Sequence, residues 1–224
     1  MNSQEEVLRQ VTDHLTWDQR VDASTIEVEV RDSAVVLRGT VPSFYVRMAA
    51  EYDAWSVPGV AQVVNELEVA FRQPNQVPTD ESIRDRIVDT LLWNPHVEIE
   101  TVDVAVESGK VTLTGMTDAY WKKVRIEEQV VETIGVRSVR NQLRVVPHRK
   151  INDSEIAKAI HDALARDVAA DIVELRINVT DGVVKLEGNV RNRNTYIAAE
   201  NVARHTLGVV DIDNSLKVTN PPRP

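Results

Sequence analysis

The chain has 224 residues, of which 42% are hydrophobic and 27% charged, a balance typical of folded globular domains rather than disordered ones. Its net charge of -9 argues against a phosphate backbone as the main partner, so we expect no nucleic-acid binding. The absence of cysteine excludes disulfides, thiolate metal sites and a cysteine nucleophile. No apolar run reaches the roughly 18 residues that cross a bilayer, so the protein is not expected to be transmembrane.

The N-terminal residues show no basic segment followed by an apolar run, so the sequence as written carries no secretory signal. We therefore expect a cytoplasmic protein, or a periplasmic one if the sequence is that of a mature form.

One sequence unit is written three times along the chain. Gly39, Gly115 and Gly188 occupy the same position of the unit, at offsets of 76 and then 73 residues, and many apolar residues share these offsets. The predicted domains are residues 4–70, 80–146 and 153–219. Residues 71–79 and 147–152 are the predicted linkers, and the proline-rich residues 220–224 form a predicted flexible tail.

Each unit begins with a predicted amphipathic helix. In the first copy Val7, Val11 and Leu15 are spaced by four residues and make one apolar stripe, which both later copies repeat. Ser3 and Asn152 are predicted to cap this helix in the first and third copies. Trp17 and Trp93 follow the helix at equivalent positions, and we expect them to cover the core as lids.

Two strands follow the first helix, because the apolar residues then alternate with polar ones. Ser108-Gly109 and Asp181-Gly182 predict tight hairpin turns between them. A second helix is predicted next, over residues 44–57, 120–133 and 193–206, ending at a glycine C-cap. A third strand completes the unit. The fold class is therefore α+β: three tandem αββαβ domains, each a three-stranded mixed sheet with two helices on one face.

Two polar positions recur in all three copies. Asn65, Asn141 and Asn214 lie in the third strand, where an asparagine side chain typically bonds to nearby backbone amides. Glu51, Glu127 and Glu200 lie on the second helix. These glutamates either face solvent or serve as ligands of a cation such as potassium or calcium, because hard cations prefer carboxylate and carbonyl oxygens.

The start of the second helix is the best candidate for a binding surface, because it mixes aromatic and basic side chains. Such a mixture fits a lipid headgroup region or an acidic partner, while the alternative is ordinary packing of the rings and ordinary solubility from the charges. The residues of this helix-start surface are Phe44, Tyr45, Arg47, Tyr120, Trp121, Lys122, Lys123, Arg125, Arg191, Arg193 and Tyr196.

No enzyme motif is present. The chain lacks the phosphate-binding GxxxxGK[ST] loop, GxGxxG, HExxH and GxSxG, and its five histidines do not recur at equivalent positions. We therefore predict no catalytic residues, no cofactor and no dedicated metal site built on histidine.

Two recurring motifs give the chain a resemblance to the BON domain family. The strand ends Val35–Gly39, Val111–Gly115 and Val184–Gly188 read VxLxG, and the segments from Gly59 and Gly135 read GVxxVxNxL, with one Val-to-Ile change in the third copy. This resemblance covers nearly the whole chain.

The resemblance implies a non-enzymatic binding module. BON domains are regarded as attaching to phospholipid surfaces, and they recur in stress-induced bacterial proteins. We therefore expect weak, multivalent binding to an anionic phospholipid surface or a protein partner. The alternatives that the family offers are a cytosolic potassium or other cation sensor and a chaperone-like interaction protein.

Overall fold

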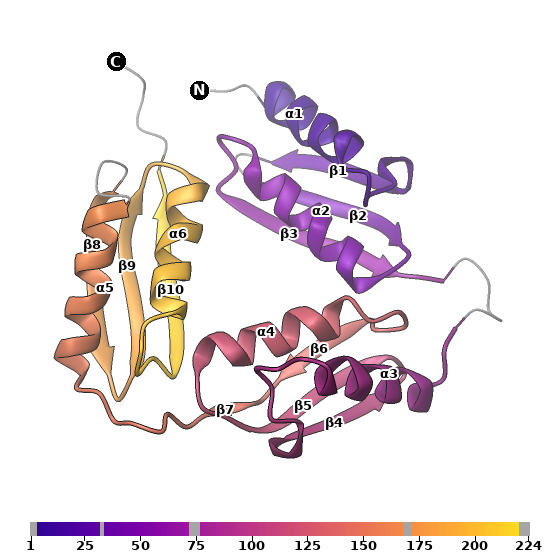
Figure 1. Ribbon diagram of the computed structural model, residues 1–224. Coiled ribbons are helices and arrows are strands. Elements are labelled where there is room, and N and C mark those ends of the chain that lie inside the picture. The colour runs from indigo at the N-terminus through magenta and orange to yellow at the C-terminus, as the bar shows by residue number, and fades with distance from the viewer. Residues whose placement is uncertain (1–3, 32–33, 72–76, 168–171, 220–224) are drawn as a thin grey trace.

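A computed structural model describes the chain except residues 1–3, 32–33, 72–76, 168–171 and 220–224. Three αββαβ units follow one another in it, which confirms the predicted fold class (Figure 1). The predicted cap at Ser3 and the predicted flexible tail lie outside the described residues. No helix in the described part of the chain is both long and apolar enough to cross a membrane.

The three units have closely similar elements. Domain 1 contains α1 (Gln4–Trp17), η1 (Ala23–Thr25), β1 (Ile26–Arg31), β2 (Ala34–Val41), α2 (Phe44–Ser56) and β3 (Gln62–Val69). Domain 2 contains α3 (Asp80–Leu92), η3 (Ile99–Thr101), β4 (Val102–Glu107), β5 (Lys110–Thr117), α4 (Tyr120–Val131), β6 (Ser138–Asn141) and β7 (Arg144–Val145). Domain 3 contains α5 (Asp153–Asp167), β8 (Ile172–Thr180), β9 (Val183–Val190), α6 (Arg193–Arg204) and β10 (Asp211–Val218).

Each sheet has the second strand of its unit in the middle. β2 pairs antiparallel with β1 and parallel with β3, and the other two domains repeat this arrangement. In domain 2 the third strand, predicted as continuous, is split into β6 and β7. The ladder continues between the two pieces, because the amide of Gln142 donates to the carbonyl of Leu113 at 2.8 Å.

A glycine two residues before the end of the middle strand is required, because two backbones approach each other closely there. Gly115 has φ +115°, and a Cβ atom built on it would lie 2.1 Å from the carbonyl oxygen of Thr101. A Cβ atom built on Gly39 or Gly188 would lie 2.1 or 2.2 Å from the equivalent carbonyl oxygen. Any side chain here would collide with the backbone at the start of the first strand, which explains why this glycine recurs in every copy.

The predicted hairpin turns are confirmed in domains 2 and 3. Ser108 and Gly109 have φ of 51° and 76°, as a type I′ turn requires. The carboxylate of Asp80, the first residue of α3, accepts hydrogen bonds from both turn amides, at 2.7 and 2.8 Å. Asp153 binds the corresponding turn amides of domain 3 at 2.9 Å each. The start of the first helix is thereby tied to the hairpin.

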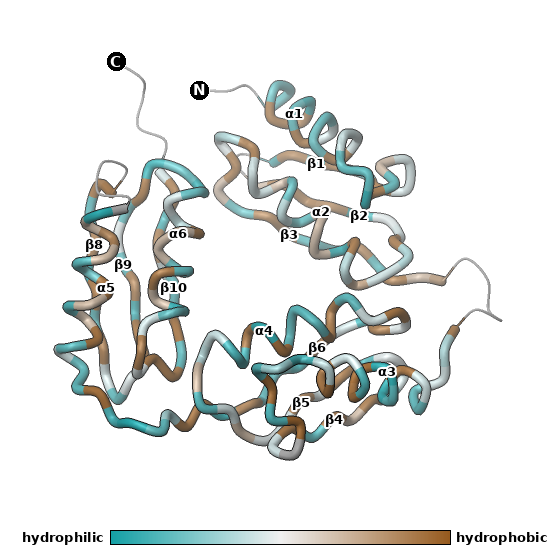
Figure 2. The backbone as a smooth tube through the Cα atoms, viewed as in Figure 1, coloured by the Kyte–Doolittle hydropathy of each residue, from teal (hydrophilic) through white to brown (hydrophobic). Residues whose placement is uncertain are grey.

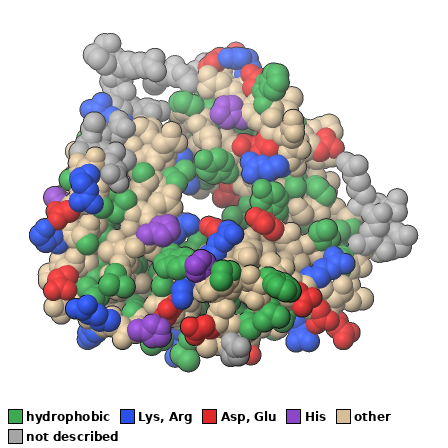
Figure 3. All heavy atoms as spheres, viewed as in Figure 1, with side chains coloured by type: hydrophobic (Ala, Val, Ile, Leu, Met, Phe, Trp, Pro, Cys, Tyr) green, Lys and Arg blue, Asp and Glu red, His purple; other side chains and the backbone are tan. Residues whose placement is uncertain are grey.

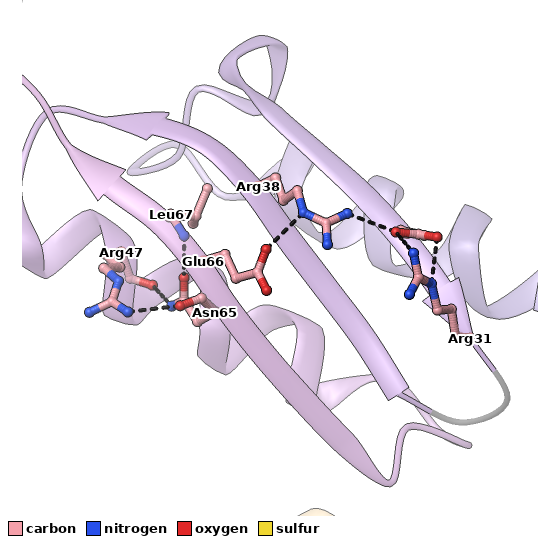
Figure 4. A network of polar contacts seen from close by, with 7 residues as sticks. Arg31, Arg38, Arg47, Asn65, Glu66 and Leu67 are labelled. Atoms are coloured by element: carbon pink, nitrogen blue, oxygen red, sulfur yellow. Dashed lines mark hydrogen bonds and ion pairs between the residues drawn. The ribbon is translucent and has the colours of Figure 1, made fainter.

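Each domain has its own apolar core between its helices and one face of its sheet, as the hydropathy of the backbone illustrates (Figure 2). The predicted first-helix stripe is buried in all three domains, at residues Val7, Val11, Leu15, Ile83, Ile87, Leu91, Ile156, Ile160 and Leu164. The opposite sheet face is polar. In domain 1 it carries a chain of ion pairs that joins all three strands, through Arg31, Glu29, Arg38 and Glu66 (Figure 4).

The three domains are arranged around a common centre, with α2, α4 and α6 on the inner side (Figure 1). Figure 3 shows an opening between the domains near the middle of this face, with acidic, basic and histidine side chains close to it. The starts of the second helices therefore lie near neighbouring domains.

Candidate interaction surface

The second helix begins at a well-defined residue in each domain. The hydroxyl of Ser43 accepts from the amide of Val46 at 3.2 Å, and the side chain of Asn192 accepts from the amide of Thr195 at 2.8 Å. Ala119 precedes the second helix of domain 2 without a side-chain cap. These starts place the helix-start surface at one end of every domain.

In domain 1 the helix-start side chains have partners. Phe44 is partly buried and packs against the core of domain 2. The hydroxyl of Tyr45 accepts from the guanidinium of Arg20 at 3.3 Å. Arg47 donates to the carbonyl of Asn65 at 2.8 Å, and its guanidinium lies 5.7 Å from the Phe44 ring. The ring and the cation are thus engaged within the protein.

In domain 2 the first residue of the helix again reaches the next domain. Tyr120 packs against the core of domain 3, where burial and the nearby carboxylates of Asp211 and Glu200 raise the pKa of its hydroxyl to about 12. Lys123 lies 6.0 Å from the same ring. This tyrosine is a domain contact rather than an open surface residue.

The remaining helix-start residues of domain 2 are partly engaged within that domain. The Trp121 ring meets His96 edge-on at 5.4 Å between centroids. Lys122 pairs with Asp118 at 2.8 Å and its side chain is only 18% exposed. Arg125 is exposed and lies 3.4 Å from a carboxylate oxygen of Glu128. Of the two lysines predicted to attract an anionic surface, Lys122 therefore has its charge balanced locally.

In domain 3 the helix-start cation is stacked between two rings. The guanidinium of Arg193 lies 4.1 Å from the ring of Tyr196 and 4.8 Å from the ring of Trp55, which belongs to domain 1. The hydroxyl of Tyr196 donates to the carbonyl of Asn214 at 3.2 Å, while Arg191 is exposed. The structure thus brings Phe44, Tyr120 and Arg193 to domain contacts and leaves Arg125 and Arg191 on the surface.

The recurring glutamate and the recurring asparagine are bonded to each other in every domain. The Asn65 amide donates to Glu51 at 3.0 Å, Asn141 to Glu127 at 3.0 Å, and Asn214 to Glu200 at 3.2 Å. Figure 4 shows Asn65 with its other partners, Arg47 and Leu67. The asparagine oxygen also accepts from the amide two residues later, as the turn-like prediction required.

These contacts form a clamp that ties the second helix to the third strand. In domains 1 and 2 the asparagine amide also donates to a helix carbonyl, that of Arg47 or Lys123. Among the described residues, no group of three or more acidic or histidine side chains is arranged to hold a metal ion. The three glutamates are therefore placed in clamps, one in each domain.

The two tryptophans predicted to cover the core do not do so. Trp17 and Trp93 are both 85% exposed, so this expectation is wrong. Each follows the buried stripe leucine by two residues, which on a helix is a rotation of about 200° and turns the side chain away from the core. The spacing of Leu15 and Trp17 already contains this signal. Arg166, at the same repeat position of domain 3, is also exposed.

A carboxyl pair lies beside Trp17 and was not singled out from the sequence. Asp18 accepts from the guanidinium of Arg20 at 2.9 Å, and this hydrogen bonding lowers the pKa of Asp18 to about 2. Burial and the negative charge of Asp18 raise the pKa of Asp53, on α2, to about 6. Only the fold brings these two acids together, because 35 residues separate them in the sequence.

Comparisons with known proteins follow the same repeat. The curated protein "Osmotically-inducible protein Y" of Escherichia coli strain K12 is 23% identical over 168 residues, covering 70% of this chain and 84% of the relative. Two solved structures of CdsD from Chlamydia trachomatis, a structural protein of the type III secretion system, were also matched. They are 13% and 12% identical, cover 97% and 94% of this chain and 99% and 90% of theirs, and have TM-scores of 0.27 and 0.24.

TM-scores this low carry no argument about fold or function. The family comparison is decisive instead, because the BON domain matches three times, at residues 3–70, 79–147 and 152–220. These matches cover most of the chain, and no catalytic family is indicated. The chain belongs to the BON domain family and consists of three BON domains in tandem.

Proposed function

We propose that this chain is a non-enzymatic binding protein of a bacterial stress response that attaches to anionic phospholipid surfaces through several domains at once. The exposure of Trp17 and Trp93 at equivalent positions is the observation that carries the proposal. The family membership and the similarity to an osmotically inducible protein support the stress-related setting.

Tryptophan side chains at the ends of helices are suited to a membrane–water interface. The indole ring is large and apolar but carries one N–H donor, so it is stable at headgroup level. In α3 the neighbouring Leu92 is 60% exposed and enlarges the apolar tip. Arg166 offers a cation at the same position of domain 3, which favours a surface that is negatively charged.

The expected affinity for an anionic membrane surface is moderate and depends on several domains binding at the same time. Transferring one exposed ring of this size contributes roughly 2 kcal/mol, and one cation near an anionic leaflet about 1 kcal/mol. Two rings and Arg166 acting together would reach about 5 kcal/mol, which corresponds to sub-millimolar binding. The exposed cations Arg125 and Arg191 of the helix-start surface add secondary attraction. One domain alone would therefore bind very weakly.

Co-sedimentation with vesicles tests this proposal. Phosphatidylglycerol-containing vesicles at low salt should carry the wild-type chain into the pellet, and phosphatidylcholine vesicles should carry much less. Trp17→Ser combined with Trp93→Ser should weaken binding more than tenfold. The matched control is Ile134→Ser with Leu207→Ser, because both side chains are exposed (64% and 67%) and lie at the opposite end of their domains.

Equal binding to the two kinds of vesicle would contradict the anionic preference. Equal loss in the tryptophan pair and in the control pair would contradict the assignment of the site. A loss confined to the tryptophan pair would support both.

A further inference from the structure

The contacts between domains repeat one rule. Phe44, Tyr120 and Arg193 are the first residues of α2, α4 and α6, and they are separated by the repeat offsets of 76 and 73 residues. Each reaches the domain that follows it in cyclic order: Phe44 contacts domain 2, Tyr120 contacts domain 3, and Arg193 contacts domain 1.

The receiving side is repeated as well. Arg193 stacks on Trp55 near the end of α2, and the equivalent positions in α4 and α6 are Val131 and Arg204. Arg204 pairs across domains with Glu128 of α4 at 3.1 Å, and its side chain is only 22% exposed. Val131 is 7% exposed. The ends of α2 and α6 thus lie at domain contacts, and the equivalent residue of α4 is buried.

We propose that the first turn of the second helix is a docking element for the next BON domain of the same chain, and that three such contacts close the chain into a head-to-tail ring. The joint between domains 3 and 1, formed by Arg193, Trp55 and Tyr196, is the latch of this ring. A contact that joins the front of one domain to the back of the next is a heterologous interface. Repeating such an interface forms a closed ring when the rotation from each domain to the next brings the last domain back to the first.

The latch differs from the other two joints in both connectivity and chemistry. Linkers join domains 1 and 2 and domains 2 and 3, whereas no linker joins domain 3 to domain 1. At the first two contacts the helix-start residue is an aromatic ring packed against the core of the next domain, while at the latch it is a cation between two rings. Because no linker holds domain 3 to domain 1, the contacts of the latch alone keep these two domains together, which makes this joint the least constrained of the three. The ring therefore opens at the latch.

Closure has two consequences for the surface of the protein. It partly covers Arg193 and the Trp55 ring, so this aromatic and cationic cluster becomes more accessible when the latch opens. Closure also places equivalent residues of the three domains on the same side of the ring, because the domains are related by repeated rotation about one axis. Trp17, Trp93 and Arg166 would then face one side together.

The absence of cysteine makes a distance measurement straightforward. Glu27→Cys in domain 1 and Asn178→Cys in domain 3 place spin labels on exposed strand positions away from the joints. Pulsed electron resonance on the full-length chain should give one narrow distance distribution. Arg193→Glu should broaden it and shift it to longer distances, while Lys217→Glu, an equal charge change on the exposed face of β10, should leave it unchanged.

A rescue variant separates docking from general damage. Adding Trp55→Lys to Arg193→Glu restores an attractive pair across the latch and should narrow the distribution again, with circular dichroism confirming that every variant is folded. A broad distribution in the wild-type chain would overturn the ring. An unchanged distribution in Arg193→Glu, or no narrowing in the folded rescue variant, would overturn the latch.

Discussion

The clamp between the second helix and the third strand predicts a specific loss of stability when its asparagine is removed. Asn141 donates to the carbonyl of Lys123 and to the carboxylate of Glu127, and it accepts from the amide of Leu143, at 3.0, 3.0 and 3.2 Å. Asn141→Ala removes all three bonds. A neutral bond contributes about 1 kcal/mol and a bond to a charged group about 1.5–3, so with two neutral bonds and one charged bond domain 2 should lose roughly 3.5–5 kcal/mol.

The same reasoning predicts an order among related variants. Asn214→Ala should cost less, about 1–2 kcal/mol, because its bonds to Glu200 and to the Leu216 amide are longer, at 3.2 and 3.4 Å. Glu127→Gln should cost about 1 kcal/mol, since an amide oxygen can still accept the bond but carries no charge. Gln142→Ala is the matched control, because its side chain is exposed one position away.

Hydrogen exchange followed by mass spectrometry reads these effects domain by domain. In Asn141→Ala the protected amides of β5 and α4 should exchange roughly 400 to 5,000 times faster, while the amides of β2 and β9 keep their wild-type rates. If Asn141→Ala changes exchange no more than Gln142→Ala does, the clamp does not stabilise the domain and the reasoning is refuted.

Three further variants test other features. Gly115→Ala should cost about 3–5 kcal/mol in domain 2, seen as early thermal unfolding, because its Cβ would overlap the carbonyl of Thr101; wild-type stability would rule out that close approach. Asp53→Asn should stabilise the chain by about 1 kcal/mol above pH 6 and not at all below pH 4. The raised pKa of Asp53, about 6 beside Asp18, means that its charged form destabilises the fold as pH rises, and a pH-independent difference in melting temperature would contradict this. Asp80→Ala should cost about 1–2 kcal/mol and speed exchange at the domain 2 hairpin turn, and unchanged turn exchange would argue against the carboxylate tie.

Much of each domain could be predicted from the sequence, because local patterns specify it. The four-residue stripe of α1, the strand alternation and the Asp181-Gly182 turn each have a local physical cause, and each is present in the structure. The turn-like role of Asn141 was also predictable. Its bond to Glu127 spans 14 residues between two elements, so the recurrence of both residues indicated importance without revealing that they are partners.

The surface could be predicted less well. Trp17 was expected to be buried because tryptophan usually is, although its position relative to Leu15 turns it outward. Phe44 looked like a free surface aromatic because a single repeat gives no information about the neighbouring repeat. Contacts between domains depend on the relative orientation of whole units, which neither periodicity nor composition encodes.

Quenching of tryptophan fluorescence by brominated phospholipids tests the central claim most directly. The wild-type chain on phosphatidylglycerol vesicles should be quenched when bromine lies near the headgroups. In Trp17→Ser with Trp93→Ser, the remaining Trp55 and Trp121 should keep their emission, because both are partly buried within the protein. An unquenched wild-type chain, or equal fractional quenching in the double variant, would contradict the assignment of these two tryptophans as the lipid-binding tips.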